Sequence, residues 1–141
     1  VELRCGGTAD YGAQNLFDGN PNTGWGASAD DGAGQSVTVD FGREVHLTQV
    51  GITPGFTKVG PRADQGCASV NAFPFNRFVA EVQWTFDDGF SVTQTFARRG
   101  TLQRTRVDAT TTTVTMRIVR TEYQGRDTDT VISSMEVRGS R

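Results

Sequence analysis

The fold is decided by the stretch at residues 78–86, which reads Phe-Val-Ala-Glu-Val-Gln-Trp-Thr-Phe. Apolar side chains recur at every second position from Phe78 to Phe86, so they share one face of an extended strand. Asp87-Asp88-Gly89 follows directly and is typical of a hairpin turn. Residues 90–96 then alternate again, with Phe, Val, Gln and Phe at spacing two. The stretch therefore predicts a β-hairpin with one buried face.

The same two-residue period recurs along most of the chain. Glycine is abundant, with 17 residues, and no long window carries a helical apolar stripe. Further strands are expected at Ser36–Phe41, His46–Thr53, Thr111–Thr121 and Val131–Arg138. In the third of these, Val114, Met116 and Ile118 are predicted to face inward. The pattern favours an all-β, antiparallel jelly-roll β-sandwich of about seven or eight strands.

Two segments are too long to be simple turns, Thr8–Gln35 and Gly55–Arg77. Long loops in a compact β domain tend to carry function or to be anchored. Trp84 lies within an alternating strand and is expected in the core, and Trp25 is expected to pack beneath the first long segment.

Size and charge narrow the function. The 141 residues suit one binding domain, 1–141, which we expect to be excised from a larger protein. The net charge is −2 and the cations are scattered, so nucleic acid is not an expected partner. No apolar run is long enough for a membrane span, and no signal peptide is recognised, so membrane insertion by this domain is not expected. All cations but Lys58 are Arg, which is compatible with a GC-rich, actinobacterial source.

The two cysteines, Cys5 and Cys67, allow one intramolecular pair. A disulfide would tie the N-terminal segment to the second long loop and would indicate an oxidising compartment. Two separately buried thiols are the alternative.

The stretch at 15–25 reads Asn-Leu-Phe-Asp-Gly-Asn-Pro-Asn-Thr-Gly-Trp and resembles a segment near the start of discoidin, or coagulation-factor type C, domains. Further pieces resemble the family in its order, and they lie at residues 37–41, 45–55, 76–77, 87–89 and 123–133. The Asn-Arg and Asp-Thr pieces are similar to the bacterial NADase-type glycan-binding subgroup. The resemblance implies a galactose-binding-domain-like fold and a binding function.

The resemblance also implies a structural Ca²⁺ held by Asp18, Asn20 and Thr23, because hard cations prefer oxygen ligands. Two departures weaken this expectation. Asn20 replaces an aspartate of the family pattern, and Ser134 stands where that pattern has glutamate, with Glu136 two residues later. The alternative is an Asx turn in which Asp18 and Asn20 accept backbone N–H bonds without metal.

Sugar sites combine aromatic faces with planar polar groups that bond paired hydroxyls. Loop residues of these types are the candidate ligand-binding set: Tyr11, Phe75, Asn76, Arg77, Tyr123, Arg126 and Asp127. Phe73 and Gln124 have the same character. For Arg77 a structural alternative stays open, in which it pairs with Asp127 or Asp129 and fixes two loops.

An enzyme is not expected. His46 is the one histidine, it lies in a strand pattern, and no catalytic motif accompanies it. The sequence therefore predicts a non-catalytic, extracytoplasmic module, secreted or on a membrane-anchored protein, that binds a glycan or cell-wall polysaccharide. The alternative is a protein-binding or sensory ectodomain of a membrane-anchored bacterial protein.

Overall fold

The computed structural model describes residues 11–27, 31–62 and 65–140. Its main sheet is antiparallel and has five strands. In spatial order these are β6 (Ser91–Thr95), β5 (Phe78–Phe86), β7 (Gln103–Glu122), β2 (Ser36–Thr53) and β9 (Ser134–Ser140). Among the described residues, no helix is long and apolar enough to cross a membrane.

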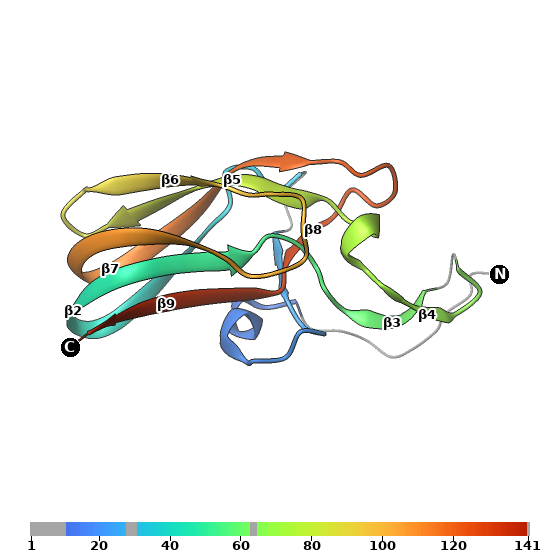
Figure 1. The fold of residues 1–141 in the computed structure, drawn as a ribbon, viewed down its shortest axis with the longest axis horizontal. Helices are drawn as coiled ribbons and strands as arrows, with labels where there is room; N and C mark the ends of the chain where they lie inside the picture. The colour runs from blue at the N-terminus through green and yellow to red at the C-terminus, as the bar shows by residue number, and fades with distance from the viewer. Residues whose placement is uncertain (1–10, 28–30, 63–64, 141) are drawn as a thin grey trace.

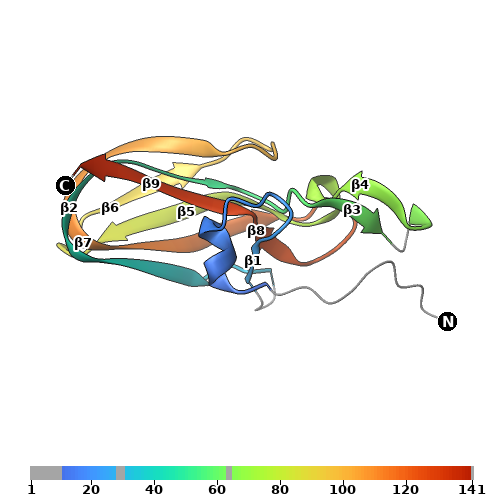
Figure 2. The same cartoon turned by 90° about the horizontal axis from the view of Figure 1, so that it is seen from below.

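Two long strands bend and turn this sheet into two layers. Residues 36–40 of β2 pair with 113–117 of β7, whereas residues 45–52 pair with 103–111, and the register shifts between them. The C-terminal half of β7 also pairs with β5, and the second half of β2 pairs with β9. Figures 1 and 2 show both strands curving round at the end of the molecule where the C-terminus lies. A β-sandwich results. The first layer holds β6, β5, the C-terminal half of β7 and the first part of β2, and the second layer holds the first half of β7, the second part of β2 and β9.

The core fills the space between the layers. Trp84, Met116 and Ile118 come from one layer, Val50 and Ile52 come from the other, and all five are buried. The burial of β5 follows the predicted alternation from residue 80 to residue 86, whereas at its start Val79 is buried together with Phe78 and Ala80.

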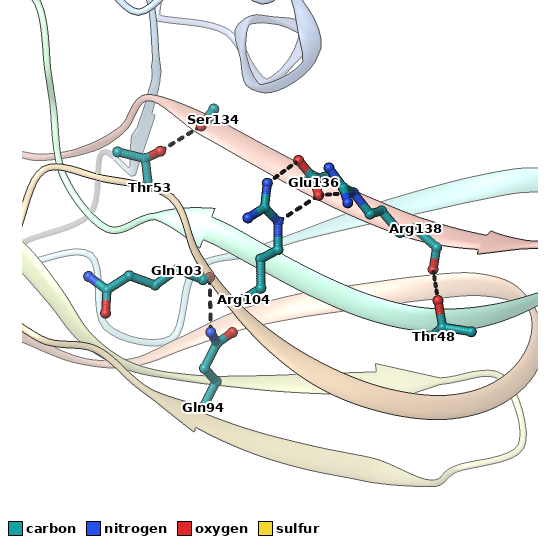
Figure 3. Close-up of polar contacts among 8 residues, drawn as sticks. All are labelled: Thr48, Thr53, Gln94, Gln103, Arg104, Ser134, Glu136 and Arg138. Carbon is teal, nitrogen blue, oxygen red and sulfur yellow. Dashed lines mark hydrogen bonds and ion pairs between the residues drawn. The ribbon is translucent and has the colours of Figure 1, made fainter.

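Two successive hydrogen bonds cross the core beside Trp84. Trp84 Nε1 donates to Gln94 Oε1 at 3.0 Å, and Gln94 Nε2 donates to the Gln103 carbonyl oxygen at 3.0 Å. Figure 3 shows the second of these bonds joining β6 to the start of β7. The buried indole N–H therefore has its partner, and the two layers are linked at this point.

The outer face of the second layer is fastened by a charged cluster on β7 and β9 (Figure 3). Arg104 Nε donates to Glu136 Oε1 at 2.8 Å, and Arg138 Nε pairs with the same oxygen. These contacts lower the pKa of Glu136, with the hydrogen bond from Arg104 as the largest cause. The cluster is partly exposed, so its contribution to stability is small.

Shorter elements lie outside the main sheet, and among them β3 and β4 lie at the end of the molecule opposite the bend in Figure 1. They are η1 (Ala13–Phe17), β1 (Trp25–Ala27) paired with β8 (Thr130–Ile132), β3 (Val59–Arg62) paired with β4 (Ala68–Asn71), and η3 (Phe73–Phe75). We call the end that holds β3 and β4 the pocket end, and we call the end where β2 and β7 curve the bend end.

The predicted all-β antiparallel sandwich is confirmed, with differences in detail. Residues 36–53 form one bent strand rather than two, and the predicted last strand is divided at Ser133. β7 begins eight positions before the predicted residue 111. Its first half was missed because its side chains are polar except for Val107 and Ala109, so no apolar alternation marks it. Trp84 is fully buried, and Trp25 is partly buried against the core.

Candidate functional site

A pocket of about 460 Å³ lies at the pocket end. Its volume is in the range of small-molecule sites. Five segments contribute to its lining, which consists of Tyr11, Gly26, Ala27, Phe56, Lys58, Gly60, Arg62, Val70, Ala72, Asn76, Asp127, Asp129, Thr130 and Val131.

One wall of the pocket is aromatic. The rings of Tyr11 and Phe56 meet edge to face, with centroids 5.9 Å apart. Tyr11 is 43% exposed, whereas Phe56 is buried with Ala72 and Val131 in a small apolar cluster. The Tyr11 carbonyl oxygen accepts a bond from Gly26 N at 2.9 Å, which ties this residue to β1. A ligand can therefore reach an aromatic surface that the strands hold in place.

The local sequence explains how Phe56 enters this wall. Gly55 precedes it, and a Cβ at position 55 would lie 2.6 Å from the Phe73 ring, so only glycine allows this approach. On the other side, Thr57 N donates to Ser133 Oγ at 2.8 Å. Both flanking residues are thus fixed, and the Phe56 side chain is directed into the pocket.

Another part of the pocket lining is charged. Arg62 Nη2 donates to Asp127 Oδ2 at 2.9 Å, which joins β3 to the loop that follows β7. Lys58 and Asp129 also line the pocket. The Arg62 and Asp127 side chains are 20% and 38% exposed, so water and ligand can reach both.

Phe75 lies behind this ion pair. The guanidinium carbon of Arg62 is 4.3 Å from the centroid of the Phe75 ring, and that of Arg126 is 5.6 Å away. Cation–π contact of this kind orients an arginine side chain. Arg62 is therefore held by the aromatic ring as well as by the Asp127 carboxylate.

Backbone bonds fix the loop that carries Asp127 and Asp129. Asp127 N donates to the Phe75 carbonyl oxygen at 2.7 Å, and Arg77 N donates to that of Asp129 at 3.0 Å. The Gln124 amide donates to the carbonyl oxygens of Phe73 and Asn76, at 2.8 and 2.7 Å. The carboxylates of the pocket thus project from a loop fastened at three points.

The predicted ligand-binding residues divide into two groups. Tyr11, Asn76 and Asp127 line the pocket. The other four do not line the pocket but contact neighbouring residues. The Phe75 ring packs against the guanidinium groups of Arg62 and Arg126. The Arg77 guanidinium lies over the Tyr123 ring, and its Nη1 donates to Thr121 Oγ1 at 3.4 Å, while Tyr123 Oη donates to the Arg126 carbonyl oxygen at 3.1 Å.

The structural alternative for Arg77 was a pairing of its side chain with Asp127 or Asp129, and the structure shows different contacts. Its guanidinium contacts Thr121 and Tyr123, and only its backbone N–H reaches Asp129. The Asp127 carboxylate is instead bonded by Arg62. Arg77 Nε is buried and has no hydrogen-bond partner among the described residues.

Sequence reasoning missed Phe56, Lys58, Arg62 and Asp129 as members of one pocket. All but Asp129 lie in the second long segment, 55–77, which was marked as functional or anchored by its length alone. A search of that segment for aromatic and planar charged residues would have found Phe56 and Arg62. Nothing in the spacing indicates that they face Asp127.

The Asp18 loop is closed by its own hydrogen bonds. Asp18 Oδ1 accepts from Asn20 N at 2.9 Å, Asp18 Oδ2 accepts from Thr23 Oγ1, and Asn20 Oδ1 accepts from Asn22 N at 2.9 Å. The hydrogen bond from Thr23 is the largest cause of a lowered pKa at Asp18. This is the Asx arrangement expected as the alternative to a metal site.

The residues of this loop are a poor match for Ca²⁺. Asp18 is the one carboxylate among the three predicted ligands, and both its oxygens already accept hydrogen bonds. Ser134 bonds Thr53 Oγ1 at 2.7 Å, and Glu136 is paired with Arg104. No group of three or more potential metal-ligating side chains occurs within the described ranges. The calcium site stays a prediction and is given no part in the function below.

Two other predictions concern single residues. Cys5 lies outside the described residues, so the Cys5–Cys67 disulfide also stays a prediction. His46 lies on β2, and its Nε2 is 2.6 Å from Asp108 Oδ1 on β7. His46 lies next to a register shift between β2 and β7, and neither residue lines the pocket.

Comparison with known proteins agrees with the resemblance to discoidin domains. Residues 5–66 match the F5/8 type C domain family. No curated protein sequence matches the chain significantly.

Three solved structures share the fold. The first is the family 32 carbohydrate-binding module of Clostridium perfringens NanJ in complex with galactose (17% identity, 92% of this chain and 88% of that chain covered, TM-score 0.61). The second is CpGH89CBM32-5 from the same species, in complex with GalNAc-β-1,3-galactose (13%, 89% and 81%, 0.59). The third is the translocation domain of the Streptococcus pyogenes NAD⁺-glycohydrolase (13%, 78% and 91%, 0.53).

Proposed function

From the F5/8 type C match and the fold shared with sugar-bound modules, we propose that this domain is a non-catalytic carbohydrate-binding module acting outside the cytoplasm. Its ligand is a sugar residue of a glycan or cell-wall polysaccharide, bound in the pocket at the pocket end. The carrying observation is that the Tyr11–Phe56 aromatic pair and the Arg62–Asp127 ion pair line one cavity.

The chemistry of the lining supports a sugar. A pyranose presents C–H groups on one face and hydroxyls around its edge. The aromatic rings supply an apolar surface for the first, and the carboxylate, guanidinium and Asn76 amide supply acceptors and donors for the second. About 460 Å³ accommodates one or two sugar rings.

The exposed large apolar side chains give less support to a protein partner. Among the described residues they are Tyr11, Phe17, Val59, Phe90, Val119 and Tyr123, which are spread along the chain. A protein-binding patch requires contiguous apolar area. The polar and aromatic pocket is therefore the better guide to function.

An NMR titration with galactose tests the proposal. Galactose is the first choice because the NanJ module has this fold and was solved with that sugar. We expect saturable shifts at residues that line the pocket. Tyr11→Ala is expected to weaken binding by about tenfold, the effect of removing one aromatic contact.

Phe90→Ala is the matched control, because Phe90 is a similarly exposed aromatic at the bend end, 49% against 43% for Tyr11. It should leave the affinity unchanged. If galactose, glucose, mannose and wall polysaccharides all fail to shift pocket resonances, the proposed function is wrong.

A further inference from the structure

The segment at residues 55–62 lines the pocket with every second residue, namely Phe56, Lys58, Gly60 and Arg62. Successive residues of an extended chain point to opposite sides, so the residues between them face away from the pocket. The contacts on that other side therefore determine where this part of the pocket wall lies.

Two of the intervening residues are bonded to Ser133, which is buried. The Gly55 carbonyl oxygen accepts from Ser133 N at 3.0 Å, and Thr57 N donates to Ser133 Oγ at 2.8 Å. The Thr57 hydroxyl adds a second anchor. Its Oγ1 donates to the Pro21 carbonyl oxygen at 3.0 Å and lies 3.1 Å from Ser133 Oγ. The backbone on both sides of the Phe56 side chain is thus joined to the body of the domain.

Val59 is anchored in the same way at the start of β3. It lies opposite Asn71 in the β3–β4 pair, and the adjacent bond of that pair runs from Ala72 N to the Lys58 carbonyl oxygen. Val59 N therefore points away from β4, and it donates to Asn22 Oδ1 at 2.9 Å. Because β3 and β4 form a separate two-stranded sheet, which is marginally stable alone, contacts at its outer edge help to fix it.

Thr57 is the residue at which the two anchors meet. Its side chain lines a second cavity of about 310 Å³ together with Pro21 and Ser133, and it is not part of the sugar-pocket lining. Its hydroxyl can therefore affect a sugar in the first pocket only by placing its chain neighbours, Phe56 and Lys58.

We propose that Thr57 is a positioning residue for sugar binding, whose hydroxyl holds Phe56 in the aromatic wall of the pocket. The proposal rests on the proposed carbohydrate-binding function. It gives the loop at 18–23 a part in that function, because Pro21 and Asn22 of this loop anchor the pocket wall.

Thr57→Val tests this by removing the hydroxyl while keeping the branched shape of the side chain. Affinity is measured by NMR titration with galactose, or with glucose or mannose if one of these binds tighter. It is expected to fall about fivefold, the equivalent of one net hydrogen bond. Thr57→Ser keeps the hydroxyl and loses only a methyl group, so it should restore most of the lost affinity.

Thr48→Val is the matched control. Thr48 is an exposed residue of β2 outside the pocket lining, and its Oγ1 donates to the Arg138 carbonyl oxygen at 3.3 Å (Figure 3). The same change of shape and polarity there should leave sugar affinity as it is in the wild type.

Asn22→Ala is a second variant, which removes the anchor of Val59 without touching Thr57. Since this bond is exposed to water, the expected loss of affinity is smaller, about threefold.

A further readout needs no sugar. The Tyr11 and Phe56 rings meet edge to face, so NOEs between their ring protons report the aromatic wall directly. These NOEs should weaken in Thr57→Val, return in Thr57→Ser, and stay unchanged in Thr48→Val.

The outcomes separate the two proposals. If Thr57→Val binds as tightly as the wild type, or if Thr57→Ser is as weak as Thr57→Val, the positioning proposal is wrong while the carbohydrate function stands. An equal loss of affinity in Thr48→Val would also contradict it, because the effect would then follow from general destabilisation. If no sugar binds the wild type, the proposed function itself fails.

Discussion

The two ends of this sandwich are built by different means. At the bend end, β2 and β7 continue from one layer into the other, and a tight turn joins β5 to β6. At the pocket end, longer connections join the strands, and polar side chains line a cavity. The comparison indicates that the buried core between the layers and the bend end provide most of the stability, whereas the pocket end provides the side chains for binding.

The polar groups at the bend end are occupied with each other. Asp87 Oδ2 accepts bonds from Thr112 N and Thr112 Oγ1, at 2.7 and 2.6 Å, and Asp87 N donates to Thr111 Oγ1 at 3.0 Å. This network joins the β5–β6 turn to the bend of β7. At the pocket end, Asp127 is paired with Arg62, but both Asp127 and Asp129 also line a cavity that a ligand can enter. Substitutions at the two ends should therefore have separable effects on unfolding and on sugar affinity.

The largest effect is expected from the body of the sandwich. Met116 is fully buried between the layers, so Met116→Ala should lower the free energy of unfolding by about 2–5 kcal/mol through lost contacts and a cavity. Urea unfolding followed by tryptophan fluorescence measures it. Sugar affinity, measured where the variant is still folded, should match the wild type; a large change would break the separation between body and pocket.

A smaller effect is expected at the bend end from Thr111→Val. Thr111 is 1% exposed, and its hydroxyl donates to the Thr113 carbonyl oxygen and accepts from Asp87 N. Valine keeps the volume but leaves these partners unsatisfied, which costs about 1–3 kcal/mol of unfolding free energy. Thr110→Val, at an exposed position on the same strand, is the control and should be close to neutral. Equal losses in both variants would show that the Thr111 network contributes nothing specific.

At the pocket end the balance should reverse. Phe56→Leu keeps an apolar side chain of similar size against Ala72 and Val131, so unfolding should change by less than about 1.5 kcal/mol. Losing the ring that meets Tyr11 should nevertheless weaken sugar binding several-fold. Parallel urea melts and NMR titrations check this, and a variant that unfolds readily while still binding sugar normally would contradict it.

The difference between the two ends also explains which features the sequence could predict and which it could not. The β5–β6 hairpin follows from alternation ending in Asp87-Asp88-Gly89, and the structure has that turn, with Gly89 at φ +85°. In the pocket, residue type pointed to Tyr11, Asn76 and Asp127, but the same criterion also selected four residues that do not line it. The Arg62–Asp127 contact joins residues 65 positions apart in irregular segments. No periodicity links such residues, so only the folded structure brings them together.

The smallest expected effect is on stability, and it comes from two carboxylates: Asp18, outside the pocket, and Asp87, at the bend end. Hydrogen bonds from Thr23 to Asp18 and from Thr112 to Asp87 lower the pKa of each side chain below its usual 3.8. A carboxyl whose pKa is lower when folded adds stability that is fully present above about pH 5 and is lost as pH falls through the folded value. Asp18→Asn and Asp87→Asn should therefore each unfold at slightly lower urea than the wild type at pH 7, and the difference should shrink toward pH 2.5. Both groups are exposed, so salt should also reduce the difference. If the gap instead widens in acid for Asp87→Asn, then the charge at the bend opposes folding, and the bend end cannot be the more tightly satisfied of the two ends.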